Sequence, residues 1–201
     1  MMHLITGGSG SGKSAYAEQQ VMEAGEKKRI YVATMMPYGE EGKMRVKRHR
    51  EMRKEKQFET LECYTGLEAV TIPQGSAVLL ECVSNLTANE MYDPSGAGED
   101  TVRAVVRGIL NLKRQADPLI VVTNEVFSDG ITYDDSTMQY LHYLGEINQQ
   151  LAAHAERVTE VVYGIPVALA RDQIRRFSVE QAAVGRKIPA NDNKRGRLPA
   201  R

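Results

Sequence analysis

Residues 7–14 read Gly-Gly-Ser-Gly-Ser-Gly-Lys-Ser, a complete P-loop of the form G-x-x-x-x-G-K-S. A short apolar run, residues 4–6, precedes the motif, and a helix-compatible stretch, residues 15–19, follows it. Glycines let the backbone curl so that successive N–H groups face phosphate oxygens, and the following helix adds a positive dipole. In this setting we expect Lys13 to pair with the β- and γ-phosphates and the Ser14 hydroxyl to bind Mg²⁺. The stretch therefore predicts a nucleoside triphosphate with Mg²⁺ as the ligand.

The composition is that of an ordinary globular protein, with 42% hydrophobic and 26% charged residues in a chain of 201. No apolar run approaches the ~18 residues of a membrane span, and no basic segment followed by an apolar one marks a signal peptide. Cys63 and Cys82 lie far apart, without the spacing of metal ligands. We therefore expect a cytoplasmic protein with no membrane span and no zinc site.

Charge is distributed unevenly along the chain. Residues 171–201 hold nine Lys or Arg and three Asp or Glu, a net charge of +6, so residues 1–170 carry 17 basic and 23 acidic residues, a net charge of −6. A basic segment can bind nucleic acid, but this one is rich in Pro, Gly, Asn and Asp and poor in large apolar residues. We expect a flexible, solvated extension and no nucleic-acid partner.

Short apolar runs alternate with helix-compatible stretches along residues 1–170. The runs at residues 4–6, 29–34, 77–81, 119–124 and 158–164 are rich in β-branched and aliphatic residues, and a further short strand is possible at 58–62. Helices are expected at 14–24, 40–56, 98–115 and 135–156, and a loop at 91–100. The alternation predicts one α/β domain over residues 1–170, with a mostly parallel sheet covered by helices on both faces.

Two glutamates follow apolar runs at the predicted carboxyl ends of strands, where ligands bind in such sheets. Glu81 ends the run AVLLE and resembles a Walker B carboxylate, which holds Mg²⁺ directly or through water. Glu125 ends LIVVTNE and could activate a nucleophile or orient water. Either residue could instead be a strand-end glutamate facing solvent.

Residues 40–56 are strongly basic and surround His49 with cations. On a helix, Arg45, His49 and Arg53 would share one face. Nearby positive charge lowers the pKa of a histidine, so a neutral His49 could attack phosphorus while the arginines stabilise charge on the phosphoryl oxygens. A solvated helix surface explains the same pattern. His3, His142 and His154 are interpreted as packing or surface residues.

The motifs, taken in order, resemble the adenosylcobinamide kinase / adenosylcobinamide-phosphate guanylyltransferase family. The resemblance covers residues 2–168 and rests on an ordered set of segments. These are ITGGSGSGKSAYAE near the N-terminus, YVAT at 31–34, R-V-x-x-H-R at 45–50, LLECVSNLTAN at 79–89, VVTNEV at 121–126, INQQLAAHAERV at 147–158 and VVYGIPV at 161–167.

The resemblance implies a RecA-like P-loop NTPase fold, a homotrimer and two reactions. The first phosphorylates the aminopropanol hydroxyl of adenosylcobinamide, a corrinoid, with ATP or GTP. The second transfers GMP from GTP to that phosphate through a guanylyl-histidine, which falls on His49. The implied nucleotide contacts are Gly7, Gly8, Ser9, Gly10, Ser11, Gly12, Lys13, Ser14, Ala33, Thr34, Met35, Arg50, Glu51, Met52, Arg53, Glu62 and Glu81.

The chain departs from the family pattern after TNEV. The family has a Gly-x-Gly-x-Val-Pro loop where residues 127–132 read FSDGIT, and it has Arg, Phe and Asp where this chain has Met138, Tyr140 and His142. We expect this region to shape the acceptor site or a subunit contact. The residues alone leave open a kinase without guanylyltransferase activity and a non-catalytic GTP-binding protein.

Overall fold

The computed structural model describes residues 1–37, 39–40, 44 and 56–169. Most of the expected basic helix at 40–56, including His49, lies outside the described residues, as does the extension at 171–201.

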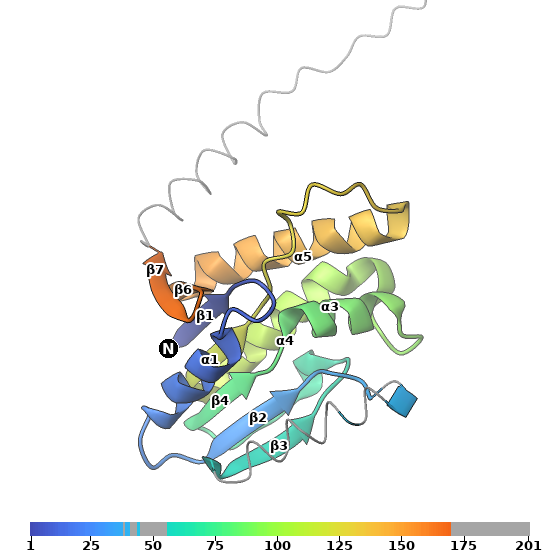
Figure 1. The fold of residues 1–201 in the computed structure, drawn as a ribbon. Coiled ribbons are helices and arrows are strands. Elements are labelled where there is room, and N and C mark those ends of the chain that lie inside the picture. The colour runs from blue at the N-terminus through green and yellow to red at the C-terminus, as the bar shows by residue number, and fades with distance from the viewer. Residues whose placement is uncertain (38, 41–43, 45–55, 170–201) are drawn as a thin grey trace, which may run out of the picture.

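The described strands form one sheet in the order β3-β2-β4-β5-β1-β6-β7 (Figure 1). All neighbouring pairs are parallel except β6 and β7, which form an antiparallel hairpin. One strand, β5, separates the P-loop strand β1 from β4, the strand that leads to Glu81; this is the RecA-like arrangement expected. The strands span β1 Met2–Thr6, β2 Arg29–Ala33, β3 Phe58–Glu62, β4 Ser76–Leu80, β5 Ala116–Val122, β6 Arg157–Val162 and β7 Ile165–Leu169.

Helices cover the sheet on both faces, so the central strands are buried on both sides. All five residues of β4 are buried, which explains its continuous apolar run. On one face α1 (Lys13–Met22) packs Ala17 and Val21 against a core that includes Ile5 and Ile120. On the other face lie α3 (Val83–Tyr92), α4 (Thr101–Gln115) and α5 (Asp135–His154), around a larger core. Two short 3₁₀ helices, η2 (Leu67–Ala69) and η3 (Gly98–Asp100), complete the described elements.

The α/β class, the parallel sheet and the strand at 58–62 are confirmed. One α-helix and one strand were missed: α3, whose last two residues fall in the expected loop at 91–100, and β7, which reverses direction after the turn at Tyr163 and Gly164. The expected strand at 158–164 is also too long, since β6 ends at Val162. None of the described helices is long and apolar enough to cross a membrane.

His3 is a packing residue of the core, one of the two interpretations that the sequence left open. It is fully buried in β1, its Nε2 lies 2.8 Å from Thr159 Oγ1, and its ring meets that of Tyr16 edge to face. Burial, with a smaller contribution from Arg157, lowers the pKa of His3 from 6.5 to about 4. The folded protein therefore holds this imidazole neutral at neutral pH.

Candidate nucleotide-binding site

The P-loop leaves β1 at Thr6 and enters α1 at Lys13, so the first helical turn faces the loop. Gly7 and Gly12 are required by their surroundings as well as by their backbone angles. Gly12 has φ 92°, and a Cβ there would lie 3.3 Å from Gly164 Cα. A Cβ on Gly7 would lie 2.6 Å from Val161 O. The loop is therefore packed against the β6–β7 hairpin too tightly for side chains at these positions.

Backbone hydrogen bonds fix the curled loop. Ser11 N donates to Gly8 O at 3.2 Å, and Gly164 N donates to Ser11 O at 2.9 Å. The second bond joins the loop to the hairpin turn, so β6 and β7 support the loop from outside. The helix-opening N–H groups are left at the carboxyl end of β1, where a phosphate is expected.

Lys13 folds back over the loop, and its Nζ donates to Gly8 O at 3.0 Å. Burial lowers the pKa of Lys13. Burial also raises the pKa of Cys82, which keeps the thiol neutral. An anionic phosphate beside Nζ would favour the charged ammonium, so the half-buried lysine is suited to bind one.

Glu81 follows β4 and reaches across to the end of β2. Its Oε2 accepts hydrogen bonds from Thr34 N at 2.9 Å and Met35 N at 3.1 Å. The Thr34 hydroxyl donates to Cys82 O at 2.9 Å. The expected Walker B carboxylate therefore also fixes residues 33–35, a segment predicted separately to contact nucleotide.

Glu125 lies after β5, next to the P-loop. Its backbone N donates to Gly7 O at 3.2 Å. Its side-chain Oε1 accepts from Phe127 N at 3.0 Å and from Ser128 Oγ at 2.7 Å. The carboxylate of Glu125 thus holds the start of the following loop in place. The backbone of Glu125 joins that loop to Gly7, the first residue of the P-loop.

The strand order sets how far the expected contacts lie from the P-loop. Neighbouring strands are ~4.8 Å apart, so the end of β4 at Glu81 lies about 10 Å from β1 along the sheet, and the end of β2 at Ala33 about 14 Å. Glu62, on the edge strand β3, lies about 19 Å away by the same spacing and accepts a hydrogen bond from Tyr64 OH. By this spacing Glu81 lies nearer to the P-loop than Glu62 does, and Glu125, which is hydrogen-bonded to Gly7, lies next to it. His49, Arg50, Glu51, Met52 and Arg53 lie outside the described residues.

Two further residues join the strand ends, and sequence patterns gave them no separate role. Asn124 Nδ2 donates to Ser84 Oγ at 3.0 Å and to Cys82 Sγ at 3.4 Å, which links the end of β5 to the start of α3. Asn89 Nδ2 donates to Thr34 O at 2.8 Å from the far end of α3.

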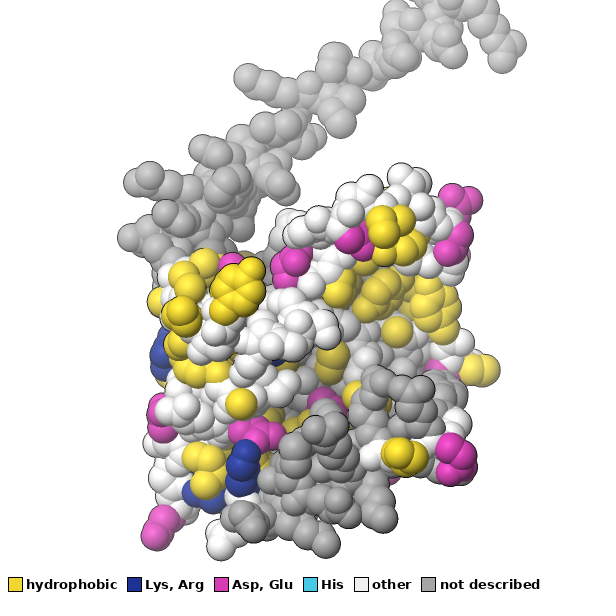
Figure 2. Space-filling view, in the orientation of Figure 1, with side chains coloured by type: hydrophobic (Ala, Val, Ile, Leu, Met, Phe, Trp, Pro, Cys, Tyr) yellow, Lys and Arg dark blue, Asp and Glu magenta, His cyan; other side chains and the backbone are white. Residues whose placement is uncertain are grey.

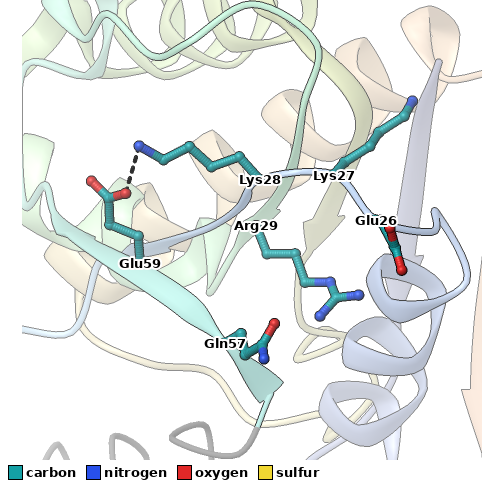
Figure 3. Close-up of a pocket in the computed structure, with 6 residues that line it drawn as sticks. All are labelled: Glu26, Lys27, Lys28, Arg29, Gln57 and Glu59. Atoms are coloured by element: carbon teal, nitrogen blue, oxygen red, sulfur yellow. Dashed lines mark ion pairs between the residues drawn. The ribbon is translucent and has the colours of Figure 1, made fainter.

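A hollow at the opposite end of the sheet from the P-loop is a poor candidate for binding the nucleotide. Figure 3 shows its lining, which comes from the segment before β2 and the start of β3. Lys28 pairs with Glu59 at 2.6 Å, and the Arg29 guanidinium donates to the carbonyls of Gly25 and Lys56. These cations already have partners, and the hollow lies at the amino ends of the strands, away from the P-loop.

The fold and site together define a P-loop nucleotide-binding α/β protein. The sequence matches the family described as cobinamide kinase / cobinamide phosphate guanyltransferase over residues 3–169, and the chain belongs to this family.

Relatives in three bacteria extend this result. The bifunctional adenosylcobalamin biosynthesis protein CobU of Escherichia coli (strain K12) is 31% identical over 183 residues, covering 84% of this chain and 99% of that protein. Its namesake in Salmonella typhimurium is 28% identical over 186 residues, with the same coverage. CobP of Pseudomonas aeruginosa is 28% identical over 172 residues, covering 84% and 97%. Among solved structures, the flagellar accessory protein FlaH from Methanocaldococcus jannaschii aligns with a TM-score of 0.40 and 10% identity, covering 86% of this chain and 79% of that one.

Proposed function

We propose that this chain catalyses two successive reactions on a corrinoid at the site around residues 7–14. It phosphorylates the hydroxyl of adenosylcobinamide with ATP or GTP, and it then transfers GMP from GTP to the new phosphate. The observation that carries the proposal is a complete P-loop, supported by the β6–β7 hairpin and hydrogen-bonded to Glu125, in a chain that matches this family over residues 3–169.

In the first reaction the corrinoid hydroxyl oxygen attacks the γ-phosphorus, and the bond from that phosphorus to the β-phosphate oxygen breaks. The P-loop N–H groups and Lys13 stabilise charge on the phosphate oxygens. Glu125 accepts the hydroxyl proton and later releases it to solvent. Its position beside Gly7 favours this role, because the acceptor must approach the γ-phosphate at the mouth of the loop.

In the second reaction His49 attacks the α-phosphorus of GTP, and pyrophosphate leaves. The phosphate oxygen of cobinamide phosphate then attacks the same phosphorus, the P–N bond breaks, and His49 is regenerated. The family resemblance supports this role for His49, and the surrounding arginines are suited to stabilise the transferred phosphoryl group. The same resemblance supports contacts from Arg50, Glu51, Met52, Arg53 and Glu62.

We propose that the Ser14 hydroxyl and the Glu81 carboxylate would hold Mg²⁺ when the nucleotide is bound. A hydroxyl and a carboxylate are the hard oxygen ligands that this ion prefers, and P-loop sites supply no more than these because phosphate and water complete the shell. Among residues 1–37 and 56–169, no group of three or more His, Cys, Asp or Glu is placed to hold a metal without the nucleotide. The ion would neutralise charge on the β- and γ-phosphates.

We further propose a cytoplasmic homotrimer built from a catalytic domain at 1–170, with residues 171–201 as a basic extension. The family match ends at residue 169, and the two cysteines are free.

Figure 2 shows hydrophobic side chains gathered over the β6–β7 hairpin, where Tyr163 is 94% and Ile165 64% exposed. An exposed apolar edge of this kind favours self-association. Light scattering on the wild type and on Ile165→Lys tests it: a trimer that the substitution dissociates supports the proposal, and a wild-type monomer refutes it.

Labelled GTP tests the reaction scheme. We expect α-labelled GTP with Mg²⁺ to leave acid-labile GMP on the protein without any acceptor, and His49→Ala to abolish that label. Transfer of the γ-phosphate to cobinamide that survives His49→Ala, with no covalent label on the wild type, would indicate a kinase only. Nucleotide binding with neither label nor turnover would indicate a non-catalytic protein.

A further inference from the structure

A hollow of about 460 Å³ lies between the loop that follows β5 and the first half of α5. Its apolar walls come from Val126, Leu141 and the rings of Tyr133 and Tyr140. Glu125, Ser128, Asp129 and Thr137 supply its polar groups. In Figure 2 hydrophobic side chains gather below the ridge formed by α5 and the loop before it.

Glu125 links the hollow to the P-loop. This residue lines the hollow, and its backbone N donates to Gly7 O, the first residue of the P-loop. A molecule that fills the hollow would therefore contact a residue that is hydrogen-bonded to the P-loop.

Every hydroxyl group that lines the hollow already donates a hydrogen bond to another group of the protein. Ser128 donates to Glu125 at 2.7 Å, Tyr133 to Asp129 at 2.5 Å and Thr137 to Asp134 at 2.7 Å. Tyr140 donates to Ser84 O at 3.4 Å. Each hydroxyl oxygen thus presents only lone pairs to a ligand, and the two carboxylates also only accept.

The charge of the described lining residues disfavours an anion. Its carboxylates are Glu125 and Asp129, and none of its eight described lining residues is Lys or Arg. A phosphate here would meet two like charges and no donor from these side chains. The matching ligand is neutral and partly apolar, and it carries N–H or O–H donors.

We infer that this hollow is the acceptor subsite, and that it takes the amide-linked alcohol arm of cobinamide and the adjoining edge of its ring. The inference rests on the proposed kinase activity and adds the location of its substrate. Glu125 accepts a hydrogen bond from the alcohol at the inner end, and the tyrosine rings and Leu141 contact the apolar part. Once phosphorylated, the arm carries charge that the two carboxylates repel, so the product leaves the hollow for the second reaction.

A bulky substitution inside the hollow, matched by the same substitution outside it, tests this location. Thr137→Trp would fill the hollow, whereas Gln139→Trp adds the same ring at an exposed position two residues along α5. Equilibrium dialysis of adenosylcobinamide against the full chain measures binding directly. We expect Thr137→Trp to weaken binding about tenfold or more, and Gln139→Trp to leave it unchanged. Ser128→Trp, on the facing loop, serves as a second filling variant should Thr137→Trp not fold.

The acid-labile label from α-labelled GTP, which needs no acceptor, should be retained by all three variants. Wild-type affinity for cobinamide in both filling variants would overturn the location and leave the proposed activity intact. If the wild type binds nucleotide but no cobinamide, the location fails together with the activity on which it rests.

Discussion

Two substitutions at Glu81 can separate a structural role of this residue from a role in catalysis. Its carboxylate accepts two backbone hydrogen bonds, from Thr34 and Met35, and it is also the proposed Mg²⁺ ligand. Glu81→Ala removes both functions. Glu81→Gln retains an acceptor oxygen for the backbone but removes the negative charge that a metal ion needs.

The two hydrogen bonds set the expected loss of stability. A hydrogen bond to a charged group contributes about 1.5–3 kcal/mol, and partial exposure of Glu81 reduces this, so Glu81→Ala should lower the free energy of unfolding by about 2–4 kcal/mol. Glu81→Gln should lower it by less than about 1.5 kcal/mol, because a neutral acceptor replaces a charged one.

Activity should fall in both variants. Loss of a preorganised charge at the reacting phosphates costs roughly 10²–10³-fold in rate, so Glu81→Gln should be nearly as slow as Glu81→Ala in γ-phosphate transfer to cobinamide. Urea denaturation and transfer rates at several Mg²⁺ concentrations give the two quantities. A Glu81→Gln enzyme with wild-type rate at limiting Mg²⁺ would refute the metal role and leave only the backbone one.

Three other perturbations follow from the site and the core. Gly12→Ala should weaken ATP binding and lower stability by about 1–2 kcal/mol, since φ is 92° and Gly164 is 3.3 Å from the new Cβ; equal ATP affinity in calorimetry would contradict this. Lys13→Ala should abolish measurable phosphoryl transfer yet leave the melting temperature unchanged or raised, because a half-buried ammonium is removed; a clear loss of stability would argue against that reading of its lowered pKa. The folded pKa of His3 lies below its unfolded value, so its contribution to stability is full above pH 6.5 and is lost as pH falls toward 4, by up to about 3 kcal/mol; His3→Gln should flatten this part of the stability–pH curve, and an unchanged slope would contradict the assignment.

Sequence patterns predicted the parts of the fold that depend on local chemistry. The P-loop, the apolar runs and the alternation of strands with helices were sufficient for the parallel sheet, and the strand-end rule pointed to Glu81 and Glu125. The helix at Val83–Tyr92 was missed because it begins directly after a buried strand and contains Ser84, Asn85, Thr87 and Asn89, which are weak helix formers. Its tertiary contacts stabilise it, with Leu86 in the core and Glu90 accepting from Gly66 N and Ala97 N.

Sequence patterns could not predict the long-range contacts of the fold. The bond from Gly164 to Ser11 joins residues 153 positions apart, and the link from Glu81 to Thr34 spans 47. The antiparallel return of β7 depends on a turn in which Tyr163 takes φ 52°, a conformation that a tyrosine rarely adopts. The hollow beside Glu125 combines a loop with one face of α5, and no motif marks such a surface.

The most direct test of the account follows two labels through the full chain. With Mg²⁺, adenosylcobinamide and GTP labelled at either the γ- or the α-phosphate, the corrinoid should first acquire the γ-label and then, with pyrophosphate release, the α-label. With the Lys13→Ala enzyme, the corrinoid should acquire neither label. A corrinoid that acquires no label from either position, under conditions where the protein binds GTP, would contradict the central claim that residues 7–14 serve two reactions on one substrate.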